Sequence, residues 1–400
     1  MLYLLIAVLV FVSTLIIRTL LFRPNLRPDR KTSLTELDFD RADKCFSELI
    51  KCKTVSKYNG IGEDEPEFEK LLSFLPSLFP NIYKHLKLEM VGRRGLLYHW
   101  QGESSKRASV LMAHYDVVEA LESEWDFEPF SGEMIDGVLR GRGTLDTKGT
   151  FCAVLSVADF LLAEGYTPKE DIYLAFSGEE EIHGDSAKEI AELLNKRNID
   201  ISMVLDEGGA VVEHVFSNAG RIAVIGIAEK GVMDLEISLS GEGGHASHPP
   251  VKGMVGRLAR AVENIESHPM KSVINPAFKK MIKTVGRDSS FGQRLIFANL
   301  WFFAPLISLI AKKKGGELNA MIRTSFAFTR LEGSKGMNVM PSRVSAGINI
   351  RCLNENSDED ILKHIKKASK EKELRLNVLH YEPACRYSRT DGEAWEKLTS

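Results

Sequence analysis

Acidic residues and one histidine follow three short apolar segments of this chain, at the points where strands would end. The segments are residues 110–113, 172–176 and 201–205, and each reads as a buried strand of a parallel sheet. The acidic and histidine residues, with one aspartate from a fourth stretch, are His114, Asp116, Asp146, Glu180, Glu181 and Asp206. Ligands bind at the carboxyl ends of strands in open α/β sheets, so these side chains should gather at one edge. Such a set suits Zn²⁺ or a similar divalent ion.

Each of these clusters also has an ordinary structural explanation. The His-x-Asp string at 114–116 would more often be a surface pair, and the acidic run at 179–181 would usually be a solvated loop. Asp206 alone could mark the exit from a strand. The recurrence of three acidic clusters at strand ends within one stretch of chain favours the metal site.

Composition is that of a globular protein of two or three domains. The chain has 400 residues, of which 44% are hydrophobic and 27% charged. A net charge of −3 without a basic stripe gives no reason to expect nucleic acid as a partner. The five cysteines include no C-x-x-C pair, so neither a disulfide framework nor a thiolate zinc site is indicated.

The N-terminus is apolar over nearly the ~20 residues that cross a bilayer. It lacks a basic leader and a small-residue cleavage site, which favours an uncleaved single-pass transmembrane anchor at residues 1–22 over a signal peptide or a core helix. Several basic residues close or follow this segment, so the positive-inside rule favours a cytoplasmic catalytic domain. The polar and basic residues 23–40 are predicted to be a linker.

The rest of the chain divides by texture. Residues 41–230 alternate helical patterns with short apolar runs, as the first part of an α/β catalytic domain would. Residues 231–384 give the order β-α-β-β-α-β of an inserted ferredoxin-like domain, and residues 385–400 return to the catalytic domain.

Residues 295–311 are unusually apolar for the interior of such an insertion. Their length raises a second membrane span, but Asn299 and Pro305 argue against one. A lipophilic surface or a pocket wall beside the active site is the favoured interpretation. An apolar stretch of this kind suits a long acyl chain or apolar side chains as the bound group.

Several strings resemble a known family, the co-catalytic dizinc metallopeptidases that include carboxypeptidase S, glutamate carboxypeptidase and aminoacylases. The strings are MAHYDVV, LRGRGTLDTKG, LAFSGEEEIHG, LDEGG, GGHASHPP and GMNVMPSRVSAGINIR. The resemblance covers residues 45–400, and residues 299–324 are similar to the carboxypeptidase S and N-fatty-acyl-amino-acid hydrolase branch. It implies a zinc-peptidase-like catalytic domain with a lid, two Zn²⁺ per subunit (Co²⁺ or Mn²⁺ as substitutes), and hydrolysis of a peptide or N-acyl amide beside a free carboxylate.

The resemblance also implies roles for individual residues. The metal ligands would be His114, Asp146, Glu181 and Asp206. Asp146 would bridge the two ions, and Asp116 would orient the imidazole of His114. Glu180 would be the general base that takes a proton from a metal-bound water. A shift of one residue would make Glu179 and Glu180 the pair instead, but the spacing to Gly184 favours Glu180 and Glu181.

Three lid residues resemble those that contact substrate in the family. His245 corresponds to the histidine that stabilises the tetrahedral oxyanion, in many relatives from a neighbouring subunit, which suggests a homodimer formed through the lid. Asn338 and Arg351 correspond to the pair that grips the substrate's carboxylate or carbonyl, for which a planar guanidinium is well suited.

One departure from the family is clear. The family's remaining zinc ligand is a histidine in a C-terminal G-T-D-x-R-H-like string, and no such string occurs before Ser400. The chain is therefore expected to be truncated where its catalytic domain resumes. The alternative is a non-catalytic or single-metal, membrane-tethered binding protein of the same fold.

Overall fold

The computed structural model describes residues 1–23, 37–213 and 221–399, so most of the predicted linker at 23–40 lies outside the described residues. The chain forms two compact units. One comprises Arg30–Gly208 with Glu396–Ser400, and the other comprises Met1–Asp29 with Gly209–Trp395. We call them the five-stranded unit and the four-stranded unit after their sheets.

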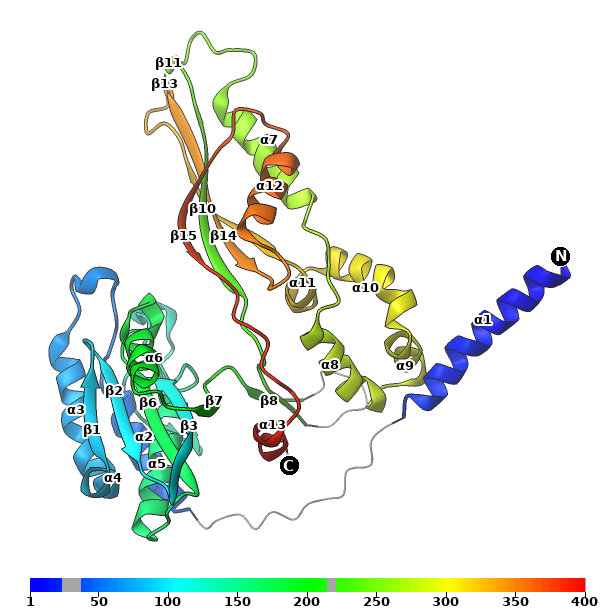
Figure 1. Cartoon of the computed structure of the whole chain (residues 1–400). Helices are drawn as coiled ribbons and strands as arrows, with labels where there is room; N and C mark the ends of the chain where they lie inside the picture. The colour runs from blue at the N-terminus through cyan, green and yellow to red at the C-terminus, as the bar shows by residue number, and fades with distance from the viewer. Residues whose placement is uncertain (24–36, 214–220, 400) are drawn as a thin grey trace. The chain divides into compact units, whose positions relative to one another are not determined.

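The five-stranded unit contains a mixed sheet with the strand order β1-β2-β6-β3-β7 (Figure 1). In that order the strands are Lys87–Val91, Gly95–Trp100, Glu170–Ser177, Ser104–His114 and Ile201–Leu205. Strands β6, β3 and β7 are parallel neighbours, which confirms the pairing expected for the three apolar segments. The expectation that all three are buried is wrong for β7. It pairs only with β3 at the sheet edge, and Val204 is 54% exposed.

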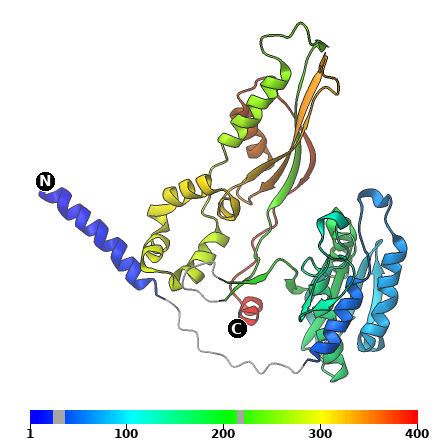
Figure 2. The ribbon, with the colours of Figure 1, turned by 180° about the vertical axis from the view of Figure 1, so that it is seen from behind.

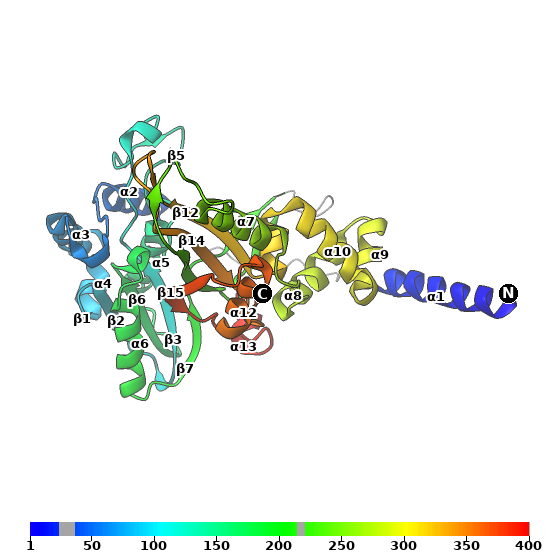
Figure 3. The same cartoon turned by 90° about the horizontal axis from the view of Figure 1, so that it is seen from above.

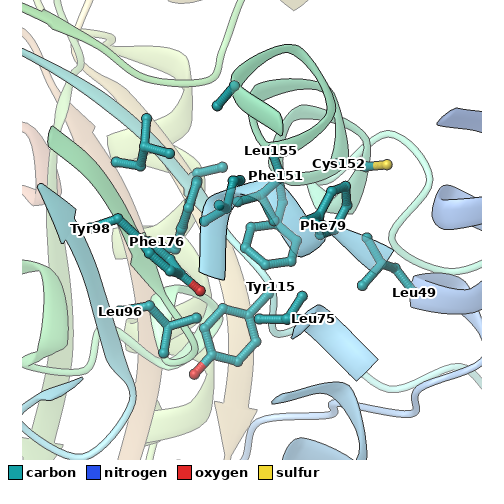
Figure 4. Packing of buried hydrophobic residues seen from close by; sticks show 14 of the residues in the cluster. Leu49, Leu75, Phe79, Leu96, Tyr98, Tyr115, Phe151, Cys152, Leu155 and Phe176 are labelled. Carbon is teal, nitrogen blue, oxygen red and sulfur yellow. The ribbon is translucent and has the colours of Figure 1, made fainter. Parts of the chain in front are cut away.

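Helices cover both faces of this sheet (Figure 1 and Figure 2). One face carries α2, α3, α4 and α5, which are Phe39–Ile50, Glu65–Leu78, Pro80–His85 and Lys148–Ala163. The other face carries α6, Ser186–Lys196. Figure 4 shows the larger core, in which Phe151 of α5 meets Phe176 of β6 edge to face at 4.7 Å, beside Tyr115. Burying each such ring contributes roughly 1.5–3 kcal/mol, which fixes β6 and β3 under α5.

The four-stranded unit has an antiparallel sheet with the order β12-β14-β10-β15. In that order the strands are Ser325–Glu332, Arg343–Cys352, Gly231–Ser240 and Arg375–Glu382. Helices α7, Met254–Ser267, and α12, Asp358–Ser369, pack on one face of it (Figure 1 and Figure 3). The elements follow one another as β-α-β-β-α-β, and β10 takes no part in the five-stranded sheet. The role of residues 231–384 as a lid, and the predicted domain boundaries, remain predictions.

An arm of helices extends the four-stranded unit between α7 and β12. Its helices α8 to α11 are Pro276–Val285, Phe291–Ala298, Leu300–Lys314 and Gly316–Ile322. The axes of α9 and α10 meet at a bend of 109°. The N-terminal helix α1, Leu2–Leu21, lies against α9 (Figure 1). Helix α1 is long and apolar enough to cross a membrane, a test that a signal sequence also passes.

Short elements complete the fold. They are the antiparallel strand pairs β4–β5 (Met134–Ile135 with Val138–Leu139), β8–β9 (Ala210–Val212 with Ile222–Val224) and β11–β13 (Gly244–His245 with Val339–Met340), and helix α13, Glu393–Leu398.

Candidate metal centre

The five-stranded unit places the carboxylates of two candidate ligands against one buried imidazole. His114 ends β3 and is 2% exposed. Its Nε2 lies 2.9 Å from Asp146 Oδ1 and 3.6 Å from Glu207 Oε2. One ligand atom from each of these residues lies within 4.8 Å of the others, close enough to share a metal ion. The Glu180 carboxylate is next to them, 3.8 Å from the same Nε2.

The sheet explains why these residues meet. His114 pairs with Ser177 at the carboxyl end of β6, three residues before Glu180. On the other side β3 pairs with β7, whose last residue, Leu205, is opposite Leu111. Three parallel strands therefore end at one edge, and the loop that follows each of them begins there.

Asp116 organises the loop that carries the glutamates. Its fully buried carboxylate accepts the backbone N–H of Glu180 and that of Glu181, each at 3.1 Å, and the hydroxyl of Ser56 at 2.7 Å. The expected contact to His114 is made mainly by the backbone. The Asp116 carbonyl oxygen is 3.0 Å from His114 Nδ1, whereas the carboxylate is 3.4 Å away. This contact leaves Nε2 directed at the acidic cluster.

Glu179 is engaged away from the cluster. Its buried carboxylate accepts the hydroxyl of Ser186 and lies 3.6 Å from the guanidinium of Arg93. Gly184 closes the loop against it, because a Cβ there would lie 2.4 Å from the Cβ of Glu179. The local packing thus leaves Glu180 and Glu181 as the two glutamates of this loop whose side chains are not held elsewhere.

The electrostatics of the cluster favour a cation. Burial by itself lowers the pKa of His114, but the hydrogen bond to Asp116 and the charges of Asp116 and Glu207 raise it to about 10. Burial, followed by the charge of Asp146, raises the pKa of Glu181 to about 7. The raised pKa of His114 reflects the carboxylates around it, and that of Glu181 reflects burial first and the charge of Asp146 second. A nitrogen and several carboxylate oxygens match the donors that Zn²⁺ prefers.

Glu207 is a candidate ligand that the sequence interpretation did not name. Its carboxylate joins His114 and Asp146, whereas Asp206, the predicted ligand, is not part of that group. Asp206 directly precedes Glu207 after the end of β7 and stays a predicted ligand. Glu181 lies near enough to Asp146 to feel its charge but is outside the three-residue group.

The predicted substrate-binding residues lie in the four-stranded unit, at two ends of its sheet. His245 pairs with Val339 across β11 and β13, and the N–H of Ala246 donates to the carbonyl of Asn338 at 3.0 Å. Arg351 lies opposite Val232 at the other end of β14. Arg351 follows Arg343 by eight positions, which is about 27 Å along the strand at ~3.4 Å per residue. Asn338 and Arg351 therefore do not form a pair within one chain.

The α/β fold and the acidic cluster suit a metal-dependent enzyme, and comparison of the sequence with known protein families identifies the family. Residues 110–384 match the model of peptidase family M20/M25/M40, so the chain belongs to this family and is an enzyme of the metallopeptidase and amidohydrolase class. The predicted family membership is confirmed. The cluster at His114 is the candidate metal site of this family member.

Two relatives and one solved structure show what the chain is similar to. The chain is 33% identical over 362 residues to "Probable carboxypeptidase S-like 2" of Dictyostelium discoideum, covering 88% of this chain and 69% of the relative. It is 32% identical over 372 residues to an N-fatty-acyl-amino acid synthase/hydrolase of Mus musculus, covering 90% and 74%. A dipeptidase structure from Saccharomyces cerevisiae shares the fold with a TM-score of 0.59 and 18% identity, over 88% of this chain and 81% of that one.

Proposed function

We propose that this protein is a zinc-dependent hydrolase that cleaves an amide bond next to a free carboxylate, in a peptide or an N-acyl amino acid. The observation that carries the proposal is the position of Glu180. Its backbone is tied to Asp116, and its carboxylate lies 3.8 Å from the imidazole of the acidic cluster. The two relatives named above, a carboxypeptidase and an N-fatty-acyl-amino acid hydrolase, support this substrate class.

The residues of the cluster have different roles in the proposed reaction. His114, Asp146 and Glu207 would hold metal, with Glu181 next to them, and two metal ions bound there would polarise the scissile carbonyl and lower the pKa of water. Glu180 takes the proton of the attacking water and passes it to the leaving amine. Asp116 keeps His114 in the orientation that presents Nε2 and keeps the glutamate loop beside it.

Arg351 is our candidate for binding the substrate carboxylate. It is exposed, and among the described residues its side chain forms no ion pair with an acid. A guanidinium offers a carboxylate two parallel hydrogen bonds. His245 and Asn338 lie together at the separate β11–β13 pair, beyond the end of the four-stranded sheet that is remote from Arg351. We therefore assign them to the site of a second copy in a homodimer, where His245 would stabilise the oxyanion.

The central experiment compares Glu180→Gln with Glu192→Gln, a matched change on the exposed face of α6. The first variant should lose turnover of an N-acyl amino acid while keeping its zinc content, because a base has been removed and no ligand has. The second should keep both. Full activity of Glu180→Gln would reject Glu180 as the base.

Zinc content of the unmodified protein tests the alternative function. About two zinc ions per chain favour the hydrolase, as a two-metal site requires. One ion or none, together with no turnover, would favour a non-catalytic or single-metal binding protein of the same fold. We further propose that α1 is an uncleaved membrane anchor with the two units on the cytoplasmic side, which protease protection of the units in sealed vesicles would test.

A further inference from the structure

A buried polar contact joins the N-terminal helix to the bend between α9 and α10. Asn299 is completely buried at this bend. Its Oδ1 accepts the Nε–H of Arg18 at 3.1 Å, and its Nδ2 lies 3.2 Å from the carbonyl of Leu15 and 2.9 Å from that of Leu295. The hydroxyl of Thr19 is also buried and lies 3.4 Å from the same nitrogen. The polar groups of the bend are therefore satisfied by α1 and by α9 itself.

Aromatic contacts extend the same interface away from this polar contact. The ring of Phe11 meets those of Trp301 and Phe302 edge to face, at 6.1 and 5.0 Å. Phe11 precedes Arg18 by seven residues, which is about 10 Å along the helix axis at 1.5 Å per residue. The start of α10 therefore lies beside the middle of the apolar helix rather than beside its basic end.

Helix α10 exposes a continuous apolar stripe. The exposed residues repeat at helical spacing and are Trp301, Phe302, Leu306, Leu309 and Ile310. Ile307 and Ala311 point to the opposite side, where they pack with Phe278 of α8 and Ile322 of α11. An ordinary surface helix has a polar solvent-exposed face, whereas the exposed face of α10 is apolar. Lys312–Lys314 follow at the end of the helix.

We infer that the α10 stripe is embedded in a lipid bilayer next to α1, as a second membrane-contacting element of this protein. Three observations favour lipid over a protein partner. The stripe is continuous with a helix that is apolar on almost all sides, so both share one surrounding medium. A polar bend at membrane depth requires its groups to be satisfied internally, and those of Asn299 are. Basic residues stand at the ends of both helices, where headgroups would lie.

This inference rests on the proposed anchor and is tested with the full chain. The protein is reconstituted in vesicles of phosphatidylcholine and phosphatidylserine, with or without lipids brominated in the acyl chain, which quench nearby tryptophan fluorescence. The four tryptophans are Trp100, Trp125, Trp301 and Trp395. Trp301→Phe should lose most of the quenching by brominated lipid, whereas Trp125→Phe should retain it. Equal quenching of Trp301→Phe and the unmodified protein would overturn the inference.

A second pair of variants tests the lipid contact of α10 without relying on Trp301, which also contacts Phe11. In the Trp301→Phe background, Leu309→Trp should restore quenching because Leu309 lies in the middle of the stripe. Leu331→Trp, at a more exposed position on β12, should not. A chain that fails to float with the vesicles would contradict the anchor itself. A chain that floats while Leu309→Trp stays unquenched contradicts only the lipid contact of α10. Concentration-dependent cross-linking through Leu309→Cys would also contradict that contact, because it would place a second copy of the chain on the stripe.

Discussion

At the scale of single residues, Asp116 orients the loop that carries Glu180 and Glu181 at the candidate metal centre. Replacing it by asparagine keeps the size of the side chain but puts an N–H donor where two backbone N–H groups and a hydroxyl now donate. We expect Asp116→Asn to lower metal affinity or activity by about 10- to 100-fold, the usual effect of removing a ligand's supporting partner. Zinc titration of the metal-free variant measures it.

Asp171→Asn is the matched control for that change. Asp171 is also a buried carboxylate, and it accepts hydrogen bonds from the Gly102 N–H at 2.8 Å and the Ser105 hydroxyl at 3.0 Å. It lies at the start of β6, at the opposite edge of the sheet from His114. This variant should lose stability without losing zinc affinity. Equal zinc affinities for both variants would show that Asp116 supports the fold and not the site.

The adjacent acids after β7 give a sharp test of the ligand set. Glu207 reaches the cluster, so Glu207→Gln should lower the zinc content and the activity, while Asp206→Asn should change zinc content little. Zinc analysis after gel filtration compares the two variants directly. The reverse result would restore the ligand that the resemblance implied, Asp206.

Sequence reasoning located this site but could not resolve it to single atoms. The apolar segments before His114, Glu180 and Asp206 predicted three parallel strand ends, because strand patterning and the parallel-sheet rule are local and general. The choice between Asp206 and Glu207 depends on the twist of one short loop, which leaves no signal in spacing. The backbone carbonyl of Asp116 was also beyond prediction, since every residue has one.

At the scale of elements, a charged contact ties the loop before α3 to the turn between β1 and β2. Glu63 receives the N–H of Lys57 at 2.7 Å and guanidinium groups of Arg93 and Arg94 at 2.6 and 2.9 Å. Burial by itself raises the pKa of Glu63, but these three partners outweigh it and lower the pKa. The turn they hold also carries the backbone carbonyl of Arg94, which accepts the N–H of Gly178 ahead of the glutamate loop.

The lowered pKa of Glu63 determines the direction in which its contribution to the unfolding free energy changes with pH. The ionised Glu63 contributes its full stability above the ordinary pKa of about 4.3, and that contribution is lost as the pH falls through the lower folded-state pKa. The difference in unfolding free energy between the unmodified protein and Glu63→Gln should therefore shrink from about pH 6 to about pH 3. Glu69→Gln, an exposed change on α3, should show no such trend in the same denaturant titrations.

Asn299 shows why the composition of residues 295–311 alone did not reveal how this segment packs. In the sequence, Asn299 and Pro305 inside the apolar run counted against a second membrane span. In the structure Asn299 lies at the break between two helices and is buried against a third element some 280 residues away in the chain. Periodicity within one segment cannot reveal a partner that distant. The favoured lipophilic surface and the buried asparagine are compatible once that partner is known.

At the scale of the whole molecule, the four-stranded unit combines a candidate carboxylate site with the apolar arm. Helix α11 leads directly into β12, whose first residue, Ser325, pairs with Arg351. The arm therefore joins the sheet at the same end as Arg351 and at the end remote from His245. A substrate with a carboxylate at one end and a long acyl chain at the other would match this arrangement.

Acyl-chain dependence is the prediction that follows for the intact protein. Burying one CH₂ contributes about 0.8 kcal/mol, so about eight carbons could contribute roughly 6 kcal/mol before ordering costs. We expect a higher kcat/KM for the N-oleoyl than for the N-acetyl form of one amino acid, measured in vesicles that hold the anchored chain. The N-oleoyl amino acid methyl ester is the control, because it keeps the chain but removes the carboxylate assigned to Arg351. Equal rates for both acyl forms, or a preference for dipeptides, would leave a general carboxypeptidase whose apolar arm serves only the membrane.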